Sequence, residues 1–500
     1  MVKIKPLPRY LLEFTIFISG AVVMILELTG SRILSPYLGA STFIWTSLIG
    51  IVLGSLSIGY YLGGKLADKN ATPKTLSNIL FLASITTLIT AAINPLILHA
   101  IEENFTDIRI AAIFASILLF TPASIFLGMV SPYAVRLKIH TVETSGRTVG
   151  NLYAISTVGS IFGTFFAGFF LLSYIGSVQI LLVLGITLSV IAIPLTPPSS
   201  FKSSKMAKLL LLIIILAVAF KTAAQKAESK TIDVDTEYSR VLILDKDNVR
   251  LMEIANDESS GMYLDSDELV FEYTKFYDIA EHFNPELKNG LLIGGGAFSY
   301  PKHFLQKFPE ANLDVVEIDE KLTELSEKYF KLDTKNPRLK IYNEDGRTYL
   351  NKTTKKYDVI FGDAFKSFYS IPTQLTTKEA VQKNYDALNE NGVVVLNVIS
   401  SIEGDTGKFT RAEYATYAKV FPQVYLFPTK DPDNPTLIQN ITLVALKSPT
   451  KPTFSSTNTD LQNYLDHLYT KEIPLDMPVL TDNFAPVDSY IAEFFDYVKL

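Results

Sequence analysis

The 500-residue sequence contains no cysteine, one tryptophan and five histidines. Without cysteine, the protein has no disulfides, no thiolate metal site and no thiol nucleophile. The histidines stand singly along the chain, so they predict no metal site. A net charge of -6 leaves no basic excess, and nucleic acid is therefore not an expected partner.

Long apolar runs are present, but only in the first half of the chain, which is predicted to be a multi-pass helical bundle over residues 1–224. Six of its seven runs are long enough to cross, or nearly cross, a hydrocarbon core that needs roughly 20 helical residues. The seventh has about twelve residues and either crosses a thinned bilayer or lies at its interface. The runs are Leu11–Leu28, Phe43–Leu62, Leu76–Leu98, Ile110–Val130, Val149–Leu172, Val178–Ile193 and Leu209–Phe220.

Basic residues in this half precede the first run and follow the second, fourth and sixth, so the positive-inside rule puts the N-terminus in the cytoplasm. Seven full crossings would then place the second half of the protein outside. If the seventh run does not fully cross, or if one long run is doubled, the second half is cytoplasmic. The basic residues are Lys3, Lys5, Arg9, Lys65, Lys69, Lys74, Arg136, Lys138, Arg147, Lys202, Lys205 and Lys208.

The apolar runs also contain one carboxylate and several closely spaced glycines, and the carboxylate allows two interpretations. Glu27 lies deep in the first run, where a carboxylate either contacts a substrate or proton, or pairs with a buried polar group. Glycines four residues apart are explained by close packing of helices in lipid. These pairs are Gly50 and Gly54, Gly59 and Gly63, and Gly159 and Gly163.

From Thr231 onward, short apolar strands alternate with amphipathic helices. Residues 225–285 are predicted to be β-rich, with a hairpin turn at Asp247 and Asn248. Residues 286–500 are predicted to be an α/β domain, because regular alternation implies βαβ units and a parallel sheet covered on both faces.

Polar residues follow four successive predicted strands of this domain, and ligands of such sheets bind beyond the carboxyl ends of the strands. Gly294 to Gly296 follow the first strand, and Glu317 ends the second, placed to accept hydrogen bonds from ribose hydroxyls. Asp345 and Asp363 end the next two. Together they predict a nucleoside site, although Asp345 before Gly346 is also typical of a turn.

At these residues the sequence resembles the spermidine synthase, or aminopropyltransferase, family. It resembles most closely the membrane-fused relatives with a major-facilitator-like bundle, through ELTGSRILSPYLG, GGKLAD, NLYAISTVGSIFGTF and LTDNFAPVD. The resemblance implies a Rossmann-like, seven-stranded methyltransferase fold that binds S-adenosylmethionine or its decarboxylated form. An intracellular substrate of this kind favours a catalytic domain on the cytoplasmic side of the cell membrane.

Residue roles carried over from the family match the strand ends. The resemblance implies that Gly294, Gly295 and Gly296 form the glycine loop, that Glu317 binds ribose, and that Asp345 with Gly346 contacts adenine. It implies that Asp363 accepts a proton from the attacking amine. The hairpin region that lines the substrate pocket in relatives includes Tyr238, Arg240, Glu272 and Tyr273, and Lys366 is a further candidate substrate contact.

Two departures from the family pattern change the expected substrate. Ala297 stands where the family has an acidic residue after the glycines, and Lys366 replaces the second aspartate of its D-x-x-D motif. Each missing carboxylate removes a charge-assisted hydrogen bond to an ammonium group, roughly 1.5 to 3 kcal/mol. Putrescine is therefore disfavoured as acceptor, and S-adenosylmethionine is favoured over its decarboxylated form.

The expected function is thus release of methylthioadenosine, either by aminopropyl-type transfer to an amine or by acceptor-free lyase or cyclisation chemistry. The alternatives are methyl transfer from S-adenosylmethionine and a nucleotide-sensing transport protein. The expected partners are a small-molecule substrate and the lipid bilayer, and a homodimer is compatible with the sequence. Near the C-terminus, Asp482 and Asn483 are predicted to cap a helix or turn, or to close the site.

Overall fold

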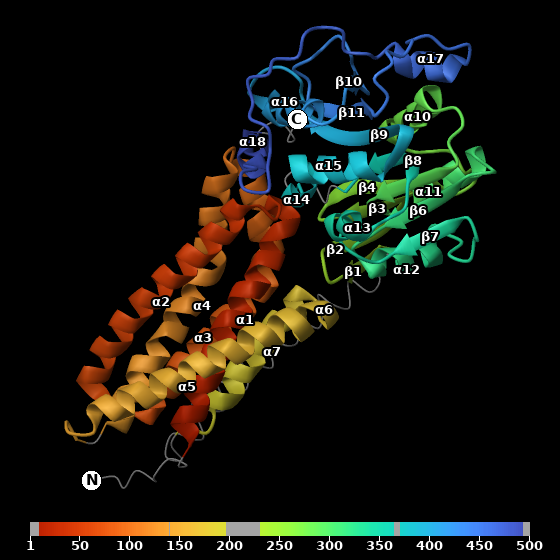
Figure 1. Ribbon diagram of the computed structural model, residues 1–500. Helices are drawn as coiled ribbons and strands as arrows, with labels where there is room; N and C mark the ends of the chain where they lie inside the picture. The colour runs from red at the N-terminus through yellow and green to blue at the C-terminus, as the bar shows by residue number, and fades with distance from the viewer. Residues whose placement is uncertain (1–9, 140, 197–230, 365–370, 494–500) are drawn as a thin grey trace. The chain divides into compact units, whose positions relative to one another are not determined.

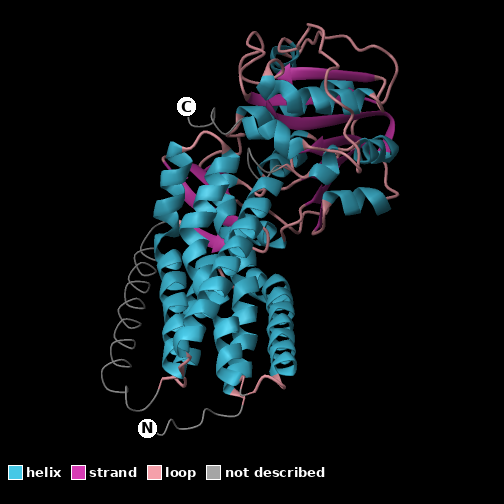
Figure 2. Ribbon diagram, turned by 90° about the vertical axis from the view of Figure 1, so that its left-hand side faces the viewer, coloured by secondary structure: helices cyan, strands magenta, loops and turns pink. Residues whose placement is uncertain are grey.

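The computed structural model describes residues 10–139, 141–196, 231–364 and 371–493. The chain divides into two compact units: Met1–Lys230 with Val234–Ser239, and Thr231–Asp233 with Arg240–Leu500. The first is helical, and the second holds both sheets apart from half of one short strand (Figure 2). The predicted fold class, a helical bundle followed by an α/β domain, is confirmed. The domain boundaries at residues 224 and 285 stay predictions.

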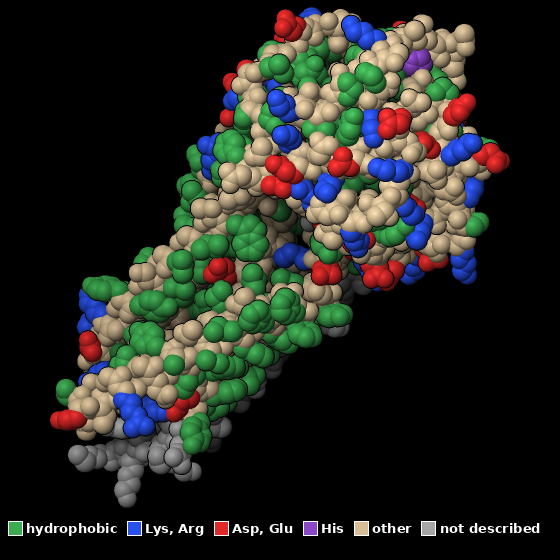
Figure 3. All heavy atoms as spheres, viewed as in Figure 1, with side chains coloured by type: hydrophobic (Ala, Val, Ile, Leu, Met, Phe, Trp, Pro, Cys, Tyr) green, Lys and Arg blue, Asp and Glu red, His purple; other side chains and the backbone are tan. Residues whose placement is uncertain are grey.

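The described part of the helical unit contains five helical stretches that are long and apolar enough to cross a membrane. The sixth predicted run forms a shorter helix of 16 residues, and the seventh lies outside the described residues. Apolar side chains cover much of this unit's surface, whereas charged ones gather on the other unit (Figure 3). The elements are α1 Leu11–Leu38, α2 Thr42–Asn70, α3 Pro73–Asn104, α4 Ile108–Lys138, α5 Ser145–Phe166, the π-helical η1 Ala167–Leu171, α6 Leu172–Tyr174 and α7 Ser177–Ala192.

Two of the three glycine pairs let helices touch backbone to backbone, as predicted. A Cβ atom on Gly59 would lie 2.3 Å from a carbonyl oxygen of α4, and one on Gly159 would lie 2.1 Å from a carbonyl oxygen of α1. For Gly50 and Gly54 the packing prediction is wrong within the described chain, because a Cβ there would meet no atom within 4 Å. Glu27 is half-buried on α1, and both interpretations of it stay predictions.

The α/β unit begins with a small four-stranded sheet in the order β1-β2-β3-β4. Strands β2 and β3 pair antiparallel, and the predicted turn at Asp247 and Asn248 joins them. Asp247 has a φ of 53°, which Asp tolerates better than most residues do. The hairpin prediction is confirmed. The strands are β1 Ile232–Asp235, β2 Arg240–Lys246, β3 Val249–Ile254 and β4 Asp257–Tyr263.

The large sheet has seven strands in the order β10-β11-β9-β8-β5-β6-β7. Neighbouring strands among β5 to β9 pair parallel, as predicted, but β10 and β11 are antiparallel. The prediction of parallel pairing covered the strands up to residue 398 and holds there. Strand β11 runs antiparallel because no helix separates it from β10, and consecutive strands pair parallel only through a crossover connection. The strands are β5 Asn289–Ile293, β6 Asn312–Val316, β7 Leu339–Tyr342, β8 Tyr357–Gly362, β9 Leu388–Ser400, β10 Gln423–Pro428 and β11 Gln439–Leu446.

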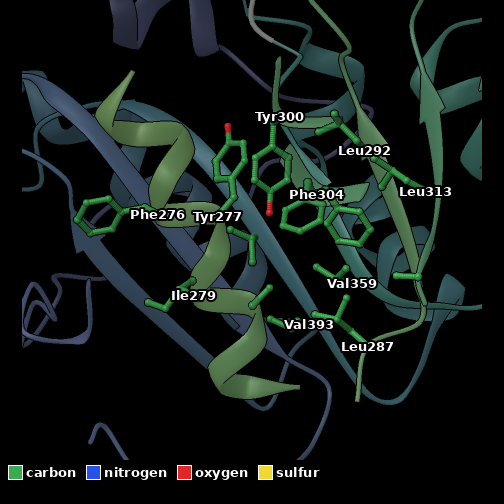
Figure 4. Close-up of a cluster of buried hydrophobic side chains, with 14 of the residues drawn as sticks. Phe276, Tyr277, Ile279, Leu287, Leu292, Tyr300, Phe304, Leu313, Val359 and Val393 are labelled. Atoms are coloured by element: carbon green, nitrogen blue, oxygen red, sulfur yellow. The ribbon is translucent and has the colours of Figure 1, made fainter. Parts of the chain in front are cut away.

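Side chains of the central strands alternate between two helix-covered faces. On one face, Phe276, Tyr277, Tyr300, Phe304 and Val359 of β8 belong to one buried cluster (Figure 4). The other face meets α13 to α16. Burial on both faces explains why β8 is almost continuously apolar. The helices of this unit (Figure 1) are α9 Glu272–Lys275, η3 Phe276–Asp278, α10 Ile279–Phe283, α11 Ser299–Lys307, α12 Glu320–Tyr329, α13 Gly346–Lys352, α14 Thr373–Thr376, α15 Lys378–Ala387, η4 Asp405–Gly407, α16 Lys408–Ala418, α17 Thr459–Leu465 and α18 Val487–Ile491.

Candidate active site

The four predicted strand-end positions lie along one edge of the large sheet. Strands β8, β5, β6 and β7 are neighbours and run parallel, so their carboxyl ends share that edge. The glycine turn follows β5, Glu317 follows β6, Asp345 follows β7, and Asp363 follows β8. Residues up to 69 positions apart in the sequence, from 294 to 363, are thereby gathered at one rim.

The turn after β5 has no room for a side chain at its first glycine. Gly294 adopts a φ of +96°, and a Cβ atom there would lie 2.2 Å from the carbonyl oxygen of Asp363. The Asp363 N–H in turn donates to the carbonyl oxygen of Ile293 at 2.8 Å. Only glycine allows both the backbone conformation and this approach, so Gly294 sets the position of the catalytic candidate.

Glu317 is almost fully buried and is held by backbone N–H groups of the protein itself. One carboxylate oxygen accepts from Gly295 at 2.8 Å and from Gly296 at 3.2 Å, and the other accepts from Asp319 at 2.9 Å. Burial raises the pKa of Glu317, and the three N–H donors oppose that rise. A carboxylate has about four lone-pair positions, so one acceptor position remains, and the ribose contact expected of Glu317 stays a prediction.

Asp363 is anchored by two side-chain donors. Its Oδ1 accepts from the Asn397 amide at 3.0 Å, and its Oδ2 accepts from the Tyr273 hydroxyl at 3.4 Å. Asn440 donates to the Asn397 oxygen at 2.9 Å, which orients the Asn397 amide toward the carboxylate. Burial raises the pKa of Asp363 to about 6, although these donors favour the ionised form.

A narrow cavity, the Asp363 cavity, opens beside this carboxylate and is lined by Tyr273, Gly294, Gly295 and β4 among others. The Ser260 hydroxyl of β4 accepts from the Ala297 N–H at 3.1 Å. The small sheet is thereby attached to the glycine turn. Sequence reasoning identified Tyr273 but missed Asn397 and Ser260.

Asp345 caps a helix that the sequence did not reveal. Its Oδ1 accepts from the Thr348 N–H at 2.9 Å, at the start of α13. Its Oδ2 accepts from the Gln374 amide at 3.1 Å. Gly346 is buried beneath Ile293. The structure thus shows a capping role for Asp345, and the adenine contact expected of Asp345 and Gly346 stays a prediction.

The C-terminal segment is tied to two helices close to Asp345. Thr481 and Phe484 close a tight turn with Asp482 and Asn483 at its centre. The Asp482 side chain caps no helix, because it pairs with Arg347 of α13 at 2.7 Å and accepts from the hydroxyl of Thr377, the N-cap of α15.

The remaining predicted site residues lie apart from the Asp363 cavity or outside the described residues. Glu272 is exposed and pairs with Lys275 at 2.9 Å. Tyr238 stands in the turn between β1 and β2, where its N–H donates to the Thr236 hydroxyl oxygen. Arg240 pairs with Asp233, and residue 366 is not described.

An open sheet with a glycine turn and carboxylates at its carboxyl edge is typical of a Rossmann-like domain. Residues 272–452 match the spermine/spermidine synthase domain. A polyamine aminopropyltransferase of Vibrio vulnificus is 30% identical over 233 residues, covering 44% of this chain and 75% of that protein. One from Streptococcus pneumoniae is 30% identical over 229 residues, covering 44% and 73%. The chain therefore belongs to the spermine/spermidine synthase family, as the resemblance predicted.

Two solved structures are also similar to part of this chain. A probable spermidine synthase from Corynebacterium glutamicum is 24% identical with a TM-score of 0.42, covering 53% of this chain and 94% of that chain. Spermidine synthase from Thermotoga maritima is 22% identical with a TM-score of 0.36, covering 44% and 73%.

Proposed function

We propose that the α/β unit transfers the aminopropyl group of decarboxylated S-adenosylmethionine to an amine and releases methylthioadenosine. Family membership supports this class of reaction. The observation that carries it is the Asp363 carboxylate, which is half-buried beside the glycine turn and held by Asn397 and Tyr273.

In the proposed step, the amine nitrogen attacks the aminopropyl carbon bonded to the sulfonium. The carbon–sulfur bond breaks, and its electron pair stays on sulfur as methylthioadenosine leaves. The proton lost by the amine passes to Asp363. A base with a pKa of about 6 is mostly ionised at neutral pH and accepts a proton more readily than an ordinary aspartate.

The residue after the three glycines, where relatives hold the aminopropyl donor, supports a second candidate function. This function is cleavage of S-adenosylmethionine without an acceptor. Ala297 is fully buried, and its N–H is bonded to Ser260. The position therefore supplies no carboxylate for the ammonium group of a decarboxylated donor. A donor that retains its own carboxylate suits this position better.

The deciding experiment incubates the purified full-length protein with each donor, with and without aliphatic amines, and follows the nucleoside product by chromatography. Methylthioadenosine that appears only with decarboxylated donor plus amine supports transfer. Release from S-adenosylmethionine alone supports the lyase, and S-adenosylhomocysteine would show methyl transfer. Asp363→Asn should abolish release while nucleoside binding persists, and unchanged release would reject Asp363 as the base.

We propose further that the helical unit crosses the cell membrane six times, with the N-terminus and the α/β unit in the cytoplasm. Five long apolar helices and α7 support an even number of crossings, and the basic residues mark the cytoplasmic side. One observation opposes a cytoplasmic α/β unit: Arg32 of α1 donates to the carbonyl oxygens of Thr236 and Glu237, and the Ser177 N–H of α7 donates to Asp235, so residues 235–237 lie at the end of the bundle opposite the N-terminus. Because the chain has no cysteine, single cysteines can be labelled without background. An impermeant maleimide should label Thr106→Cys on intact cells, but not Glu143→Cys or Glu390→Cys. Labelling of Glu390→Cys without labelling of Glu143→Cys would place the α/β unit outside and overturn the arrangement.

A further inference from the structure

A larger cavity, here called the basic pocket, lies at the edge of the large sheet opposite the Asp363 cavity. Its volume is about 430 Å³, within the range of roughly 300 to 1,000 Å³ that small-molecule sites occupy. It opens where β5 to β8 begin, and these strands run parallel, so their amino ends share one edge. Asp363 follows the carboxyl end of β8. At about 3.3 Å per residue, β8 separates the two sites by about 20 Å.

Cations outnumber carboxylates among the described residues that line this pocket. The cations are Arg338, Lys340, Lys355 and Lys356, and the one acidic side chain in that lining is Asp314. Lys355 pairs with Asp314 at 2.5 Å. Three positive charges of the described lining are therefore not matched by a carboxylate of that lining. A concave site with such an excess of one sign concentrates ligands of the opposite charge.

Two of the four cations are held in place by hydrogen bonds. Asp314 is buried in the middle of β6, and the oxygen that accepts from Lys355 also accepts from the hydroxyls of Tyr357 at 2.7 Å and Tyr349 at 3.2 Å. Arg338 donates to three backbone carbonyl oxygens in and just after α11. These bonds use three of its five N–H donors. Because both cations are ordered before a ligand arrives, binding costs less conformational entropy.

Lys340 and two asparagines add further donors to the pocket. Lys340 is exposed and is the register partner of Asp314 in the parallel pair of β6 and β7, and its ammonium lies 5.0 Å from the centre of the Tyr342 ring. Asn289 and Asn312 are register partners at the first residues of β5 and β6, and both line the pocket. Each carboxamide offers two N–H donors. The pocket thus combines ammonium, guanidinium and amide donors.

A phosphate group matches this set of donors. It carries a charge of about −1.5 to −2 at neutral pH and has three strongly accepting oxygens, and arginine and lysine are the side chains that commonly bind it. A carboxylate ligand carries one charge and two acceptor oxygens, so it would use fewer of the donors. The volume equals that of about fourteen waters in the liquid. This room indicates a phosphate ester or a compound with several phosphates.

We propose that the basic pocket binds the phosphate of a phosphorylated compound through Arg338, Lys340, Lys355 and Lys356. The phosphate belongs either to a soluble molecule of nucleotide size or to the headgroup of an anionic lipid, and both sources present the same chemistry. The inference is independent of aminopropyl transfer, because the described linings of the basic pocket and of the Asp363 cavity share no residue.

Calorimetry tests the site, with inorganic pyrophosphate titrated into the purified full-length protein in an uncharged detergent. Pyrophosphate has two phosphate groups and no base, and the carboxylates beside the glycine turn repel it. The wild type should bind it, and the affinity should fall as salt is added. Lys340→Gln and Lys356→Gln should each weaken binding at least about tenfold, the loss expected for one charge-assisted hydrogen bond. Lys419→Gln removes an exposed cation outside the pocket and should leave the affinity unchanged.

A second measurement distinguishes the two sources of the phosphate. The protein is placed in nanodiscs of phosphatidylcholine, with or without phosphatidylglycerol, and the titration is repeated. A lipid headgroup as ligand predicts that phosphatidylglycerol displaces pyrophosphate from the wild type. A soluble ligand predicts that pyrophosphate still binds in both discs and is displaced by ADP. Absence of pyrophosphate binding by the wild type, or equal affinity in wild type, Lys340→Gln and Lys356→Gln, would overturn the site.

Discussion

Replacing Asn397 with leucine should shift the acid limb of the pH profile of transfer toward higher pH. Asn397 donates to Asp363 at 3.0 Å and favours the charged carboxylate, while burial raises the Asp363 pKa to about 6. Leucine has a similar size but no donor. Without that hydrogen bond the ionised form is less stable, and the pKa must rise further.

The size of the shift follows from the geometry. A hydrogen bond to a charged group contributes about 1.5 to 3 kcal/mol, and one pKa unit corresponds to about 1.4 kcal/mol. The Asn397→Leu variant should therefore shift the Asp363 pKa upward by about one to two units. Tyr273→Phe should shift it in the same direction but less, because the Tyr273 contact is longer at 3.4 Å.

The assay is kcat/KM for the amine between about pH 5 and 9, followed by methylthioadenosine release, because this ratio reports the pKa of the free enzyme. Wild-type activity should be half-maximal near pH 6 and should fall as Asp363 is protonated. Tyr425→Phe, which alters a tyrosine of β10 bonded to Gln423, serves as control. An acid limb that stays at the wild-type position in both Asn397→Leu and Tyr273→Phe would refute the assignment of Asp363 as the titrating base.

Asp363→Asn should cut turnover by about 10²- to 10⁴-fold and yet unfold at a higher temperature than wild type at pH 8. Folding raises the pKa of Asp363 from 3.8 to about 6. The folded protein therefore loses about 3 kcal/mol of unfolding free energy as the pH rises from below 3.8 to above about 6, because Asp363 must then be ionised in the fold. Scanning calorimetry should show no gain at pH 4. Gly294→Ala should abolish nucleoside binding in equilibrium dialysis, because its Cβ would collide with the Asp363 carbonyl oxygen, and retained affinity would contradict this. Asp482→Asn should lower the unfolding free energy by less than about 1 kcal/mol, because its pairing with Arg347 is half-exposed; a larger loss would indicate that the C-terminal turn supports the whole sheet edge.

The periodicity of apolar residues along the sequence was sufficient to predict the membrane-type helices and the alternating strands and helices. The six longer apolar runs and the alternation of strands and helices each extend over many residues, so local errors cancel. The edge position of Glu317 and Asp363 then followed, because parallel neighbours end at the same side of a sheet. Short or irregular elements gave no such signal. Helix α13 has only seven residues, and Asp345 before Gly346 was compatible with a plain turn as well as with the N-cap it forms.

Pairings across long sequence separations could not be predicted from one sequence. Asn397 interrupts an apolar run within β9, which was a usable signal for a buried hydrogen bond, but its partner Asp363 is 34 positions away. Glu413 lies in an amphipathic helix, where a carboxylate normally faces water. Only the packing of α16 against the sheet shows that it faces inward.

Three acidic side chains of the α/β unit are buried in different ways, and the difference bears on what each can do. Glu317 accepts three backbone N–H groups, so its position is fixed by the fold before any ligand arrives. Asp363 accepts from two side chains, which leaves its pKa sensitive to substitution and close to the working pH. Glu413 has no donor among the described residues. Burial therefore raises the pKa of Glu413 well above its ordinary value, and the neutral acid is the form that costs least in this part of the core.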